Sequence, residues 1–351
     1  MLDLDCPSAI LIEASSGQVL YAKDADTPRP MASVTKIMTL LLIMEALEDG
    51  KFTLADMVSC SEHAVSMGGS QIYLKEGESL SVEEMLKAIV VSSANDAAVA
   101  MAEFVAGSDR SFVSLMNERA KKLGMKNTHF VNCTGLDADD HYSSAADIAV
   151  MSAQLLKHDT IRDYTTIWMD TLRDGSFGLS NTNKLVRFYE GCTGLKTGST
   201  SKALYCMSAS AKRDGMELIS VVLASPTSAK RFEDAKKLLN FGFAGYELYC
   251  AKIKVPETVT VLGSKNKSAL IECEKEVRLL VEKGVGKNIV IETKLDETVV
   301  APAEKGAKVG EVNFVSGEEI LRSFPILLSE VVEKATFLDI FLQIFRVFLT
   351  V

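Results

Sequence analysis

The chain is poor in the residues that build metal sites and disulfide frameworks. Its 351 residues include seven cysteines and four histidines, and neither type is clustered. No CxxC pair or Cys/His group has metal-ligand spacing, so the sequence predicts no metal and no other cofactor. The cysteine count is odd, and in a chain of this length unpaired, buried thiols are expected rather than a disulfide framework.

Positive charge is also scarce. Lys and Arg number 38 against 47 Asp and Glu, which gives a formal net charge of −9. This balance argues against a nucleic-acid partner held by phosphate contacts. A substrate must therefore be recognised by a few placed cations and not by a broad positive field.

The N-terminus shows no leader sequence. Asp3 and Asp5 stand where a signal peptide would have a basic stretch followed by an apolar run. Taken alone, this absence predicts a cytoplasmic protein.

The first two thirds of the chain alternate between strand and helix patterns. Residues 8–21 contain two apolar runs joined by a Gly-containing turn, which predicts a β-hairpin. Ser81 and Glu84 form a capping box at the start of a helix that runs to about Val91. Further helices are predicted over 33–48, 95–107, 111–123, 144–157 and 228–241, and strands over 203–211 and 217–224. The predicted fold class is α/β, an antiparallel sheet with helices.

The last third has a different texture. From about Ala251, short β-branched runs alternate with Gly and Lys/Asn turns, which predicts a small all-β domain. From Thr336 the chain is strongly apolar with one narrow polar stripe, which suits a helix in the plane of a membrane interface. The alternative is a terminal helix docked on the protein or on a second copy of it. We expect a larger α/β domain over 1–248, a β domain over 249–327 and an amphipathic helix, a membrane anchor, over 328–351.

The first chemical motif is Ser33-Val34-Thr35-Lys36, at the start of an apolar helix. A spacing of three puts the Ser33 hydroxyl and the Lys36 amine on one helical face. A serine nucleophile needs a neighbouring base, and partial burial lowers a lysine pKa so that the amine can serve. The helix N-terminus also favours negative charge near Ser33. By itself this motif is weak, because chance matches are common.

The second motif, Ser93-Ala94-Asn95, lies in the break between two predicted helices. Its hydroxyl and amide are hydrogen-bonding groups at a point where the backbone is irregular. The alternative is structural, since Asn95 or Asp96 would cap the helix that follows.

The third motif is Lys196-Thr197-Gly198-Ser199-Thr200, which leads into an apolar strand. A cation, hydroxyls and a glycine on a strand edge suit an extended peptide that ends in a carboxylate. The alternative is an ordinary turn before a strand.

The ordered combination of the three motifs is far more specific than any one of them. S-x-x-K, S-D-N and K-T-G are the motif set of penicillin-binding proteins and β-lactamases. Similarity extends over residues 9–36, 68–70, 92–98, 132–136 and 194–200. From about 7 to 246 the chain resembles the serine D-Ala-D-Ala carboxypeptidases among the low-molecular-mass penicillin-binding proteins, with a β-lactamase/transpeptidase-like domain. The β domain and the tail are similar to that family's C-terminal half.

The resemblance implies a role for each motif residue. Ser33 would attack the carbonyl between two D-alanines to form an acyl-enzyme, and Lys36 would take the serine proton. Ser93 and Lys196 would relay a proton to the leaving amine, and Asn95 would hold the substrate amide. Backbone amides of Ser33 and Ser199 would form the oxyanion hole, and Thr197 with Arg231 would hold the terminal carboxylate. Gly198 and Thr200 complete the implied substrate-binding set.

The chain departs from the family pattern at a few positions. Ala94 stands where the second motif has aspartate, and Thr193-Gly194 stands where the family has aspartate-glycine. Leu204 replaces a usual glycine in the strand after the third motif. None of these positions carries a catalytic atom, but Leu204 would change the packing beside the cleft.

The function implied is that of an exported D-alanyl-D-alanine carboxypeptidase at the outer face of the cytoplasmic membrane, its leader removed or omitted. It would trim peptidoglycan stem pentapeptides and be acylated by β-lactams. Endopeptidase or transpeptidase action remains open, and so does a catalytically silent cell-wall scaffold. A class A β-lactamase is less favoured, because no Glu-x-x-Leu-Asn element lies between Asn95 and Lys196.

Overall fold

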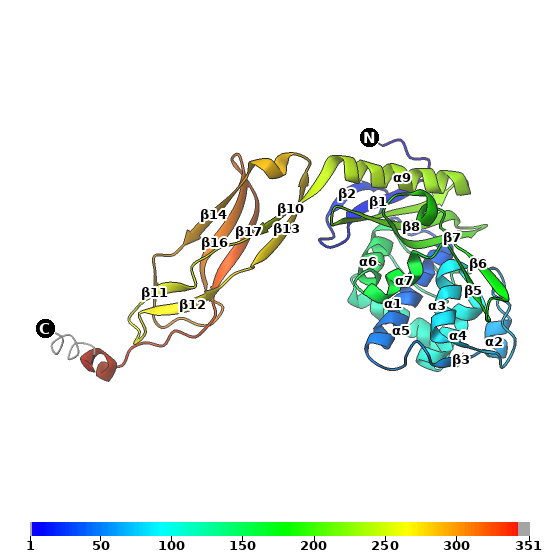
Figure 1. Cartoon of the computed structure of the whole chain (residues 1–351), viewed down its shortest axis with the longest axis horizontal. Coiled ribbons are helices and arrows are strands. Elements are labelled where there is room, and N and C mark those ends of the chain that lie inside the picture. The colour runs from blue at the N-terminus through cyan, green and yellow to red at the C-terminus, as the bar shows by residue number, and fades with distance from the viewer. Residues whose placement is uncertain (1, 343–351) are drawn as a thin grey trace. The chain divides into compact units, whose positions relative to one another are not determined.

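The computed structural model describes residues 2–342. The chain divides between Gly245 and Tyr246 into two compact units, the N-terminal unit and the C-terminal unit (Figure 1). The division falls shortly before the boundary predicted after residue 248, because α9 (Ser228–Gly245) is followed directly by β10 (Tyr246–Lys252).

The N-terminal unit is built on one antiparallel sheet with the strand order β2-β1-β9-β8-β7. β1 (Ser8–Glu13) and β2 (Val19–Lys23) form the predicted hairpin. β8 (Leu204–Arg213) and β9 (Met216–Ser225) match the two later predicted strands. β7 (Cys192–Thr200), at the sheet edge, was not predicted as a strand, because Gly194 and Gly198 interrupt its apolar pattern.

Helices cover both faces of this sheet (Figure 1). α9 packs on β1, β8 and β9 from one face, and α6 (Ala145–Leu155) packs on the same strands from the other. With both faces covered, β8 and β9 are buried along most of their length and do not alternate.

Helices on the same side of the sheet as α6 form the layer that carries the first two motifs (Figure 1). They are α1 (Lys36–Glu48), α3 (Val82–Val91), α4 (Asn95–Ala106) and α5 (Asp109–Lys122), each within a few residues of its prediction. The capping box is confirmed: the Ser81 hydroxyl accepts from the Glu84 amide, and the Glu84 carboxylate accepts from the Ser81 amide. The shorter elements are β3 (Met57–Ser59), α2 (Glu62–Val65), β4 (Ser79–Ser81), α7 (Arg162–Thr165), β5 (Met169–Leu172), β6 (Phe177–Ser180) and α8 (Leu185–Phe188).

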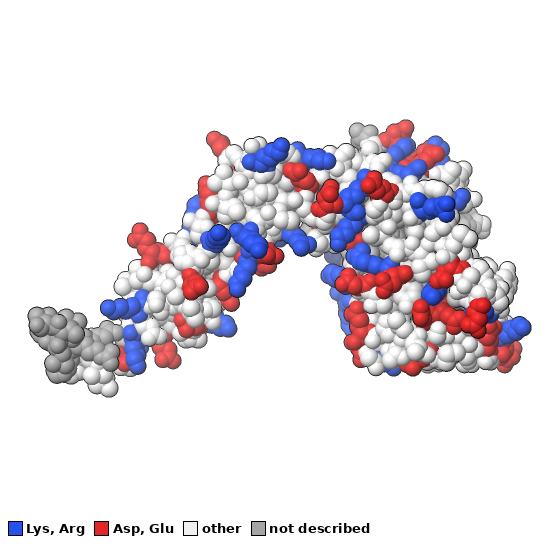
Figure 2. Space-filling view, viewed as in Figure 1, with Lys and Arg blue, Asp and Glu red and all other residues white. Residues whose placement is uncertain are grey.

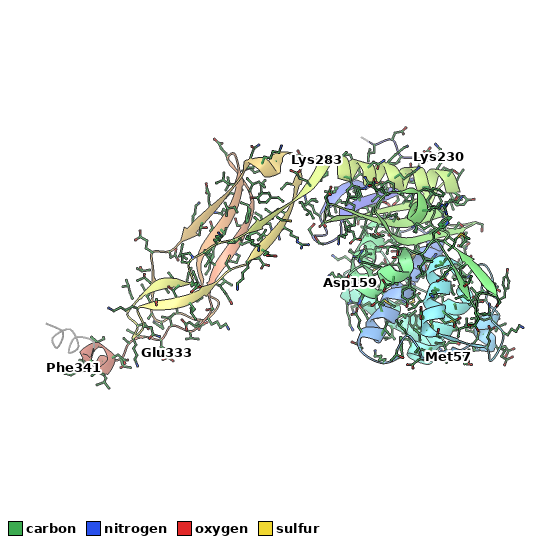
Figure 3. The ribbon with its side chains drawn as sticks, viewed as in Figure 1. Met57, Asp159, Lys230, Lys283, Glu333 and Phe341 are labelled. Carbon is green, nitrogen blue, oxygen red and sulfur yellow. The ribbon has the colours of Figure 1, made fainter. Side chains whose placement is uncertain are left out.

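The N-terminal segment is tied to α9. The backbone amides of Asp5 and Cys6 donate to the buried Asp234 carboxylate at 3.2 and 2.9 Å, and Lys230 pairs with Asp5 at 3.2 Å (Figure 3 labels Lys230). Burial, with Asp234 beside it, raises the pKa of the Cys6 thiol to about 12. All seven cysteines are free, and Cys6, Cys60, Cys133 and Cys206 are buried as predicted, whereas Cys250 is exposed.

The C-terminal unit is built mainly of β-strands. A six-stranded sheet runs β14-β16-β17-β12-β11-β15, and β10 pairs separately with β13. The strands are β11 (Thr258–Leu262), β12 (Ser268–Glu272), β13 (Glu276–Glu282), β14 (Ile289–Leu295), β15 (Thr298–Val300), β16 (Lys308–Ser316) and β17 (Glu319–Leu328). Phe314 lies at the centre of the core, with the rings of Tyr249 and Phe324 edge-on to it at 6.3 and 5.7 Å.

The described residues include only part of the predicted C-terminal helix. β17 extends to Leu328, and a helical turn spans 337–342. Thr336 caps this turn, since the Asp339 amide donates to its hydroxyl at 3.3 Å. Most of the predicted amphipathic stripe lies at 343–351, outside the described residues. Over the described part of the chain, no helix combines the length and apolar character needed to cross a bilayer.

Charged side chains of both signs are interspersed on the surface drawn in Figure 2. Lys196 of the third motif and Arg231 of α9 are not part of this surface, because both side chains are buried. Their positive charge therefore acts inside the N-terminal unit.

Candidate active site

Ser33 lies in a tight turn between β2 and α1. The sequence predicts that it opens the α-helix, but Ala32–Thr35 form a 3-10 turn and α1 begins at Lys36. In a 3-10 turn, side chains three residues apart eclipse each other, so Ser33 and Lys36 still meet. Ala32, just before the serine, has a φ of +49°, an uncommon conformation for a residue with a side chain.

Lys36 is completely buried beside the serine hydroxyl. Its Nζ donates to Ser33 Oγ at 3.0 Å, to Asn95 Oδ1 at 2.5 Å and to the Thr134 carbonyl at 2.7 Å. Burial lowers the pKa of Lys36 from 10.5 to about 7, although the negative charge of the Asp96 carboxylate opposes the shift. Near neutral pH a substantial fraction of this amine is uncharged and able to accept a proton.

Asn95 belongs to this site and is not a helix cap. The N-cap of α4 is Ala94, and Asn95 is the first helical residue. Its side chain accepts from Lys36 and donates to the Gly68 carbonyl at 2.6 Å. The Asp96 carboxylate accepts from the amides of Ile72 and Leu74 at 3.1 Å each, and also from the Ala97 amide in the first turn of α4 at 2.9 Å. Neither residue is the N-cap of α4, but Asp96 satisfies one amide of its first turn and also holds the loop before it.

Ser93 precedes Asn95 in the bend between α3 and α4. Its φ is +63°, and it is 5% exposed. A non-glycine residue in this region signals a backbone held by its surroundings, as is common at functional sites.

The third motif lies against the first. If Gly198 carried a Cβ, that atom would lie 2.7 Å from the Ser33 amide nitrogen and 2.9 Å from the Met31 carbonyl oxygen. Only glycine allows the backbone of β7 to approach the nucleophile this closely. Lys196, two residues earlier, is 1% exposed and donates to the Thr197 carbonyl at 3.0 Å. Burial, together with the charges of Lys36 and Arg231, holds the Lys196 pKa well below its usual range.

The remaining predicted substrate-binding residues are distributed along β7 and α9. The Thr197 hydroxyl donates to Thr182 at 2.7 Å, whereas the Thr200 hydroxyl donates to Asp137 at 2.6 Å. Ser199 is exposed. Arg231 is 6% exposed and donates to the Gly198 carbonyl at 3.1 Å, while its Nε is buried without a hydrogen-bond partner in the structure. Burial lowers the pKa of Arg231 to about 10.

The structure adds residues that the motifs do not include. The Thr134 carbonyl accepts from Lys36, and Gly135, with a φ of +86°, packs on the peptide that joins Ala32 to Ser33. His141 hydrogen-bonds Thr35, the third residue of the first motif, at 2.8 Å. The sequence predicts His141 only as a structural or surface residue, because no acidic residue or cysteine is paired with it. An Asn-x-x-Gly pattern at 132–135 was the one available sign that this loop serves the site.

Among residues 2–342, no group of three His, Cys, Asp or Glu side chains could hold a metal ion. The site contains buried amines, an amide and hydroxyls. This set is suited to proton transfer around a serine nucleophile.

Comparison with known proteins agrees with this geometry. The model of the D-alanyl-D-alanine carboxypeptidase family matches residues 1–227, and that of the penicillin-binding protein 5 C-terminal domain matches residues 245–334. The chain is 44% identical to the D-alanyl-D-alanine carboxypeptidase DacF of Bacillus subtilis (strain 168) over 340 residues, 95% of this chain and 87% of DacF. It is 35% identical to DacA of Escherichia coli (strain K12) over 346 residues, 95% of this chain and 85% of DacA.

Solved structures are similar as well. Penicillin-binding protein 5 from Haemophilus influenzae has a TM-score of 0.86 at 29% identity, covering 95% of this chain and 99% of the other. Penicillin-binding protein D2 from Listeria monocytogenes, in its ampicillin-bound form, has a TM-score of 0.64 at 33% identity, covering 69% of this chain and 99% of the other. The chain therefore belongs to the D-alanyl-D-alanine carboxypeptidase family.

Proposed function

We propose that this protein removes the terminal D-Ala from peptidoglycan stem pentapeptides through an acyl-enzyme on Ser33. The observation that carries the assignment is the contact between Lys36 Nζ and Ser33 Oγ at 3.0 Å, made by an amine whose pKa is about 7. A base whose pKa lies near the working pH is well suited to proton transfer.

The chemistry follows from this contact. Ser33 Oγ attacks the carbonyl carbon of the penultimate D-Ala while Lys36 Nζ takes the hydroxyl proton. The C–N bond then breaks, and the terminal D-Ala leaves as an amine after receiving a proton, which we route through Ser93 and Lys196. Water hydrolyses the ester and frees Ser33. A β-lactam would acylate the same hydroxyl and remain attached as an ester.

The substrate is held by groups on both sides of Ser33. The close approach of Gly198 to the Ser33 amide brings Ser199 beside the nucleophile, so we assign the oxyanion hole to the backbone amides of Ser33 and Ser199. The Asn95 amide would hold the substrate amide. Thr197 and Arg231 would position the D-Ala carboxylate, and the guanidinium of Arg231 would supply the cation for it.

The test compares release of D-alanine from a peptide ending in D-Ala-D-Ala by the wild type and by Ser33→Ala. We expect the wild type to release D-alanine and to be labelled by a fluorescent penicillin, and the variant to do neither. Labelling that persists in folded Ser33→Ala would overturn the assignment of the nucleophile. Labelling of Ser33 without D-alanine release would overturn the carboxypeptidase assignment and indicate an enzyme that transfers the acyl group to another acceptor.

Action on peptidoglycan occurs in the periplasm or outside the cell. We further assign this chain to the outer face of the cytoplasmic membrane, held by the segment from Thr336. The described helical turn supports this, since Phe337 is 85% exposed and Leu338, Ile340 and Phe341 are exposed too (Figure 3 labels Phe341). Exposed apolar side chains in one short segment suit the interfacial layer of a bilayer.

Sedimentation with phosphatidylglycerol vesicles tests the anchor. The full chain is expected to sediment, and a chain ending at residue 334 is expected to remain in solution with unchanged penicillin labelling. Equal sedimentation of both would overturn the anchor assignment, whereas a full chain that dimerises without binding vesicles would favour docking on a second copy.

A further inference from the structure

The backbone just before the nucleophile is clamped in an uncommon conformation. Ala32 has a φ of +49° and is 2% exposed. Gly135 packs on its carbonyl group, and Gly198 packs on the next amide, that of Ser33. Positive φ costs an L-residue about 1–2 kcal/mol, so the surroundings must hold this peptide in place.

A hydrogen bond from Thr35 completes the clamp. The Thr35 hydroxyl donates to the Ala32 carbonyl at 2.8 Å. Thr35 is fully buried and is hydrogen-bonded to His141 Nε2 at 2.8 Å. One hydroxyl therefore links the turn that carries Ser33 to a histidine distant in sequence.

The tautomer of His141 follows from its second nitrogen. Nδ1 accepts from the backbone amide of Val131 at 3.0 Å, so it carries no proton in the neutral ring. The proton is on Nε2, which donates to Thr35 and leaves the Thr35 proton for the Ala32 carbonyl. The ring is 5% exposed, and burial lowers the pKa of His141 to about 4, so the neutral form persists at neutral pH.

We propose that His141 is a positioning residue for acylation, acting through Thr35. The chain of donors runs from the Val131 amide through the imidazole and the Thr35 hydroxyl to the Ala32 carbonyl. It fixes the peptide next to Ser33 and so keeps Ser33 Oγ within hydrogen-bond distance of Lys36 Nζ. This inference rests on the proposed role of Ser33 as the nucleophile.

These hydrogen bonds orient Ser33 and do not contact the substrate. Neither Thr35 nor His141 reaches the reacting atoms, and the fixed orientation of Ser33 Oγ toward Lys36 is what they supply. A displacement of about 1 Å at a reacting group can cost ~10²-fold in rate. The loss is therefore expected in the rate of acylation rather than in the binding of the peptide.

Matched variants of the full chain separate positioning from simple stabilisation. Thr35→Val removes the hydroxyl with little change of shape, and Thr35→Ser restores it. The control is Thr165→Val: Thr165 is 1% exposed and donates to the Thr193 carbonyl at 2.7 Å, a closely similar contact away from Ser33. His141→Leu removes both ring contacts, whereas the amide of His141→Gln can still donate to Thr35.

The measurements are the rate constant of labelling by a fluorescent penicillin, kcat and KM for D-alanine release, and the melting temperature. Thr35→Val and His141→Leu are expected to slow acylation ~10-fold to ~100-fold with KM little changed. Thr35→Ser is expected to stay within about 3-fold of wild type, since the hydrogen bond remains. Thr165→Val is expected to lower the melting temperature comparably while leaving acylation unchanged.

Several outcomes would overturn the proposal. Equal acylation by Thr35→Val and wild type would show that the hydroxyl does not position Ser33, and equal losses in Thr35→Val and Thr165→Val would reduce it to a stabilising contact. If Thr35→Val is acylated slowly but both His141 variants are acylated at the wild-type rate, His141 has no part in positioning Ser33. Labelling that persists in Ser33→Ala is a separate result, because it would overturn the assigned nucleophile itself.

Discussion

The two units of this protein bury different kinds of residue. The N-terminal unit encloses three cations, Lys36, Lys196 and Arg231, together with Asn95 and Asp96. In the C-terminal unit, Asn313 is the one buried polar residue between 246 and 342. β11 alternates there between buried and exposed positions, and β14 has no buried residue.

This contrast follows from the layers. A sheet covered on both faces has room for side chains far from water, and burial there shifts the pKa of an amine. A sheet with one face in solvent buries only its alternate apolar side chains, and its charged groups keep their hydration. The chemistry is therefore confined to the N-terminal unit. Paired substitutions, one in each unit, test this division.

The largest effect is expected from a lysine exchange. Lys36→Met should slow acylation by penicillin about 10²–10⁴-fold, because the general base is lost. Lys287→Met, at an exposed lysine of the C-terminal unit, should leave the rate unchanged. The measurement is the labelling rate constant, and a Lys36→Met enzyme that acylates at the wild-type rate would refute the assignment of the base.

The pH dependence of acylation is the next test. The Lys36 pKa is lowered to about 7, so the amine is protonated below that pH and cannot take the serine proton. The acylation rate should therefore rise with pH through about 7 and fall up to ~10-fold per unit below it. Stopped-flow labelling between pH 5.5 and 8.5 (roughly the range over which a group of this pKa titrates) would measure it. A flat profile in folded protein would contradict the shifted lysine.

Gly198 and Gly310 each pack closely on a neighbouring backbone, one in each unit, so their Ala substitutions can be compared. A Cβ at Gly198 would strike backbone atoms of the Ser33 turn, and one at Gly310 would strike the backbone of β14 at Lys294. Each Ala substitution should lower the free energy of unfolding by about 1–3 kcal/mol. Only Gly198→Ala should also slow acylation, as measured by labelling at a temperature where both variants are folded. Loss of labelling in folded Gly310→Ala would break the proposed separation of roles.

The smallest effect is expected at two hairpin turns. Leu204, at the end of the β7–β8 hairpin, has a φ of +56°, whereas the β16–β17 hairpin has Gly317 at +63°. Leu204→Gly should raise the free energy of unfolding by about 0.5–1 kcal/mol by relieving strain, and Gly317→Ala should lower it by about 1 kcal/mol. Urea denaturation measures both. Destabilisation by Leu204→Gly would show that the leucine side chain contributes more through packing than its backbone costs.

Local patterns predicted much of the fold. The hairpin of β1 and β2, the Ser81 capping box and the bounds of α3 and α4 are confirmed, because neighbouring residues decide them. β7 was missed because Gly194 and Gly198 interrupt its apolar pattern; Gly198 allows contact with the Ser33 turn, and Gly194 packs on Thr165. Taken by itself, the second motif favoured a helix cap, and only the position of Lys36 shows that the Asn95 side chain belongs to the site.

The sequence by itself determined which chemical groups are present and the order of the three motifs, and these suffice to predict a serine acyl-enzyme. Only the tertiary structure decided how those groups behave. The pKa of Lys36 depends on burial by Asn95 and by the loop at Thr134, 59 and 98 residues away along the chain. The geometry of Ser33 likewise depends on Gly135, Gly198 and His141. Desolvation and close contact are set by the residues that the fold places beside a group, and the spacing within a motif does not show which residues these are.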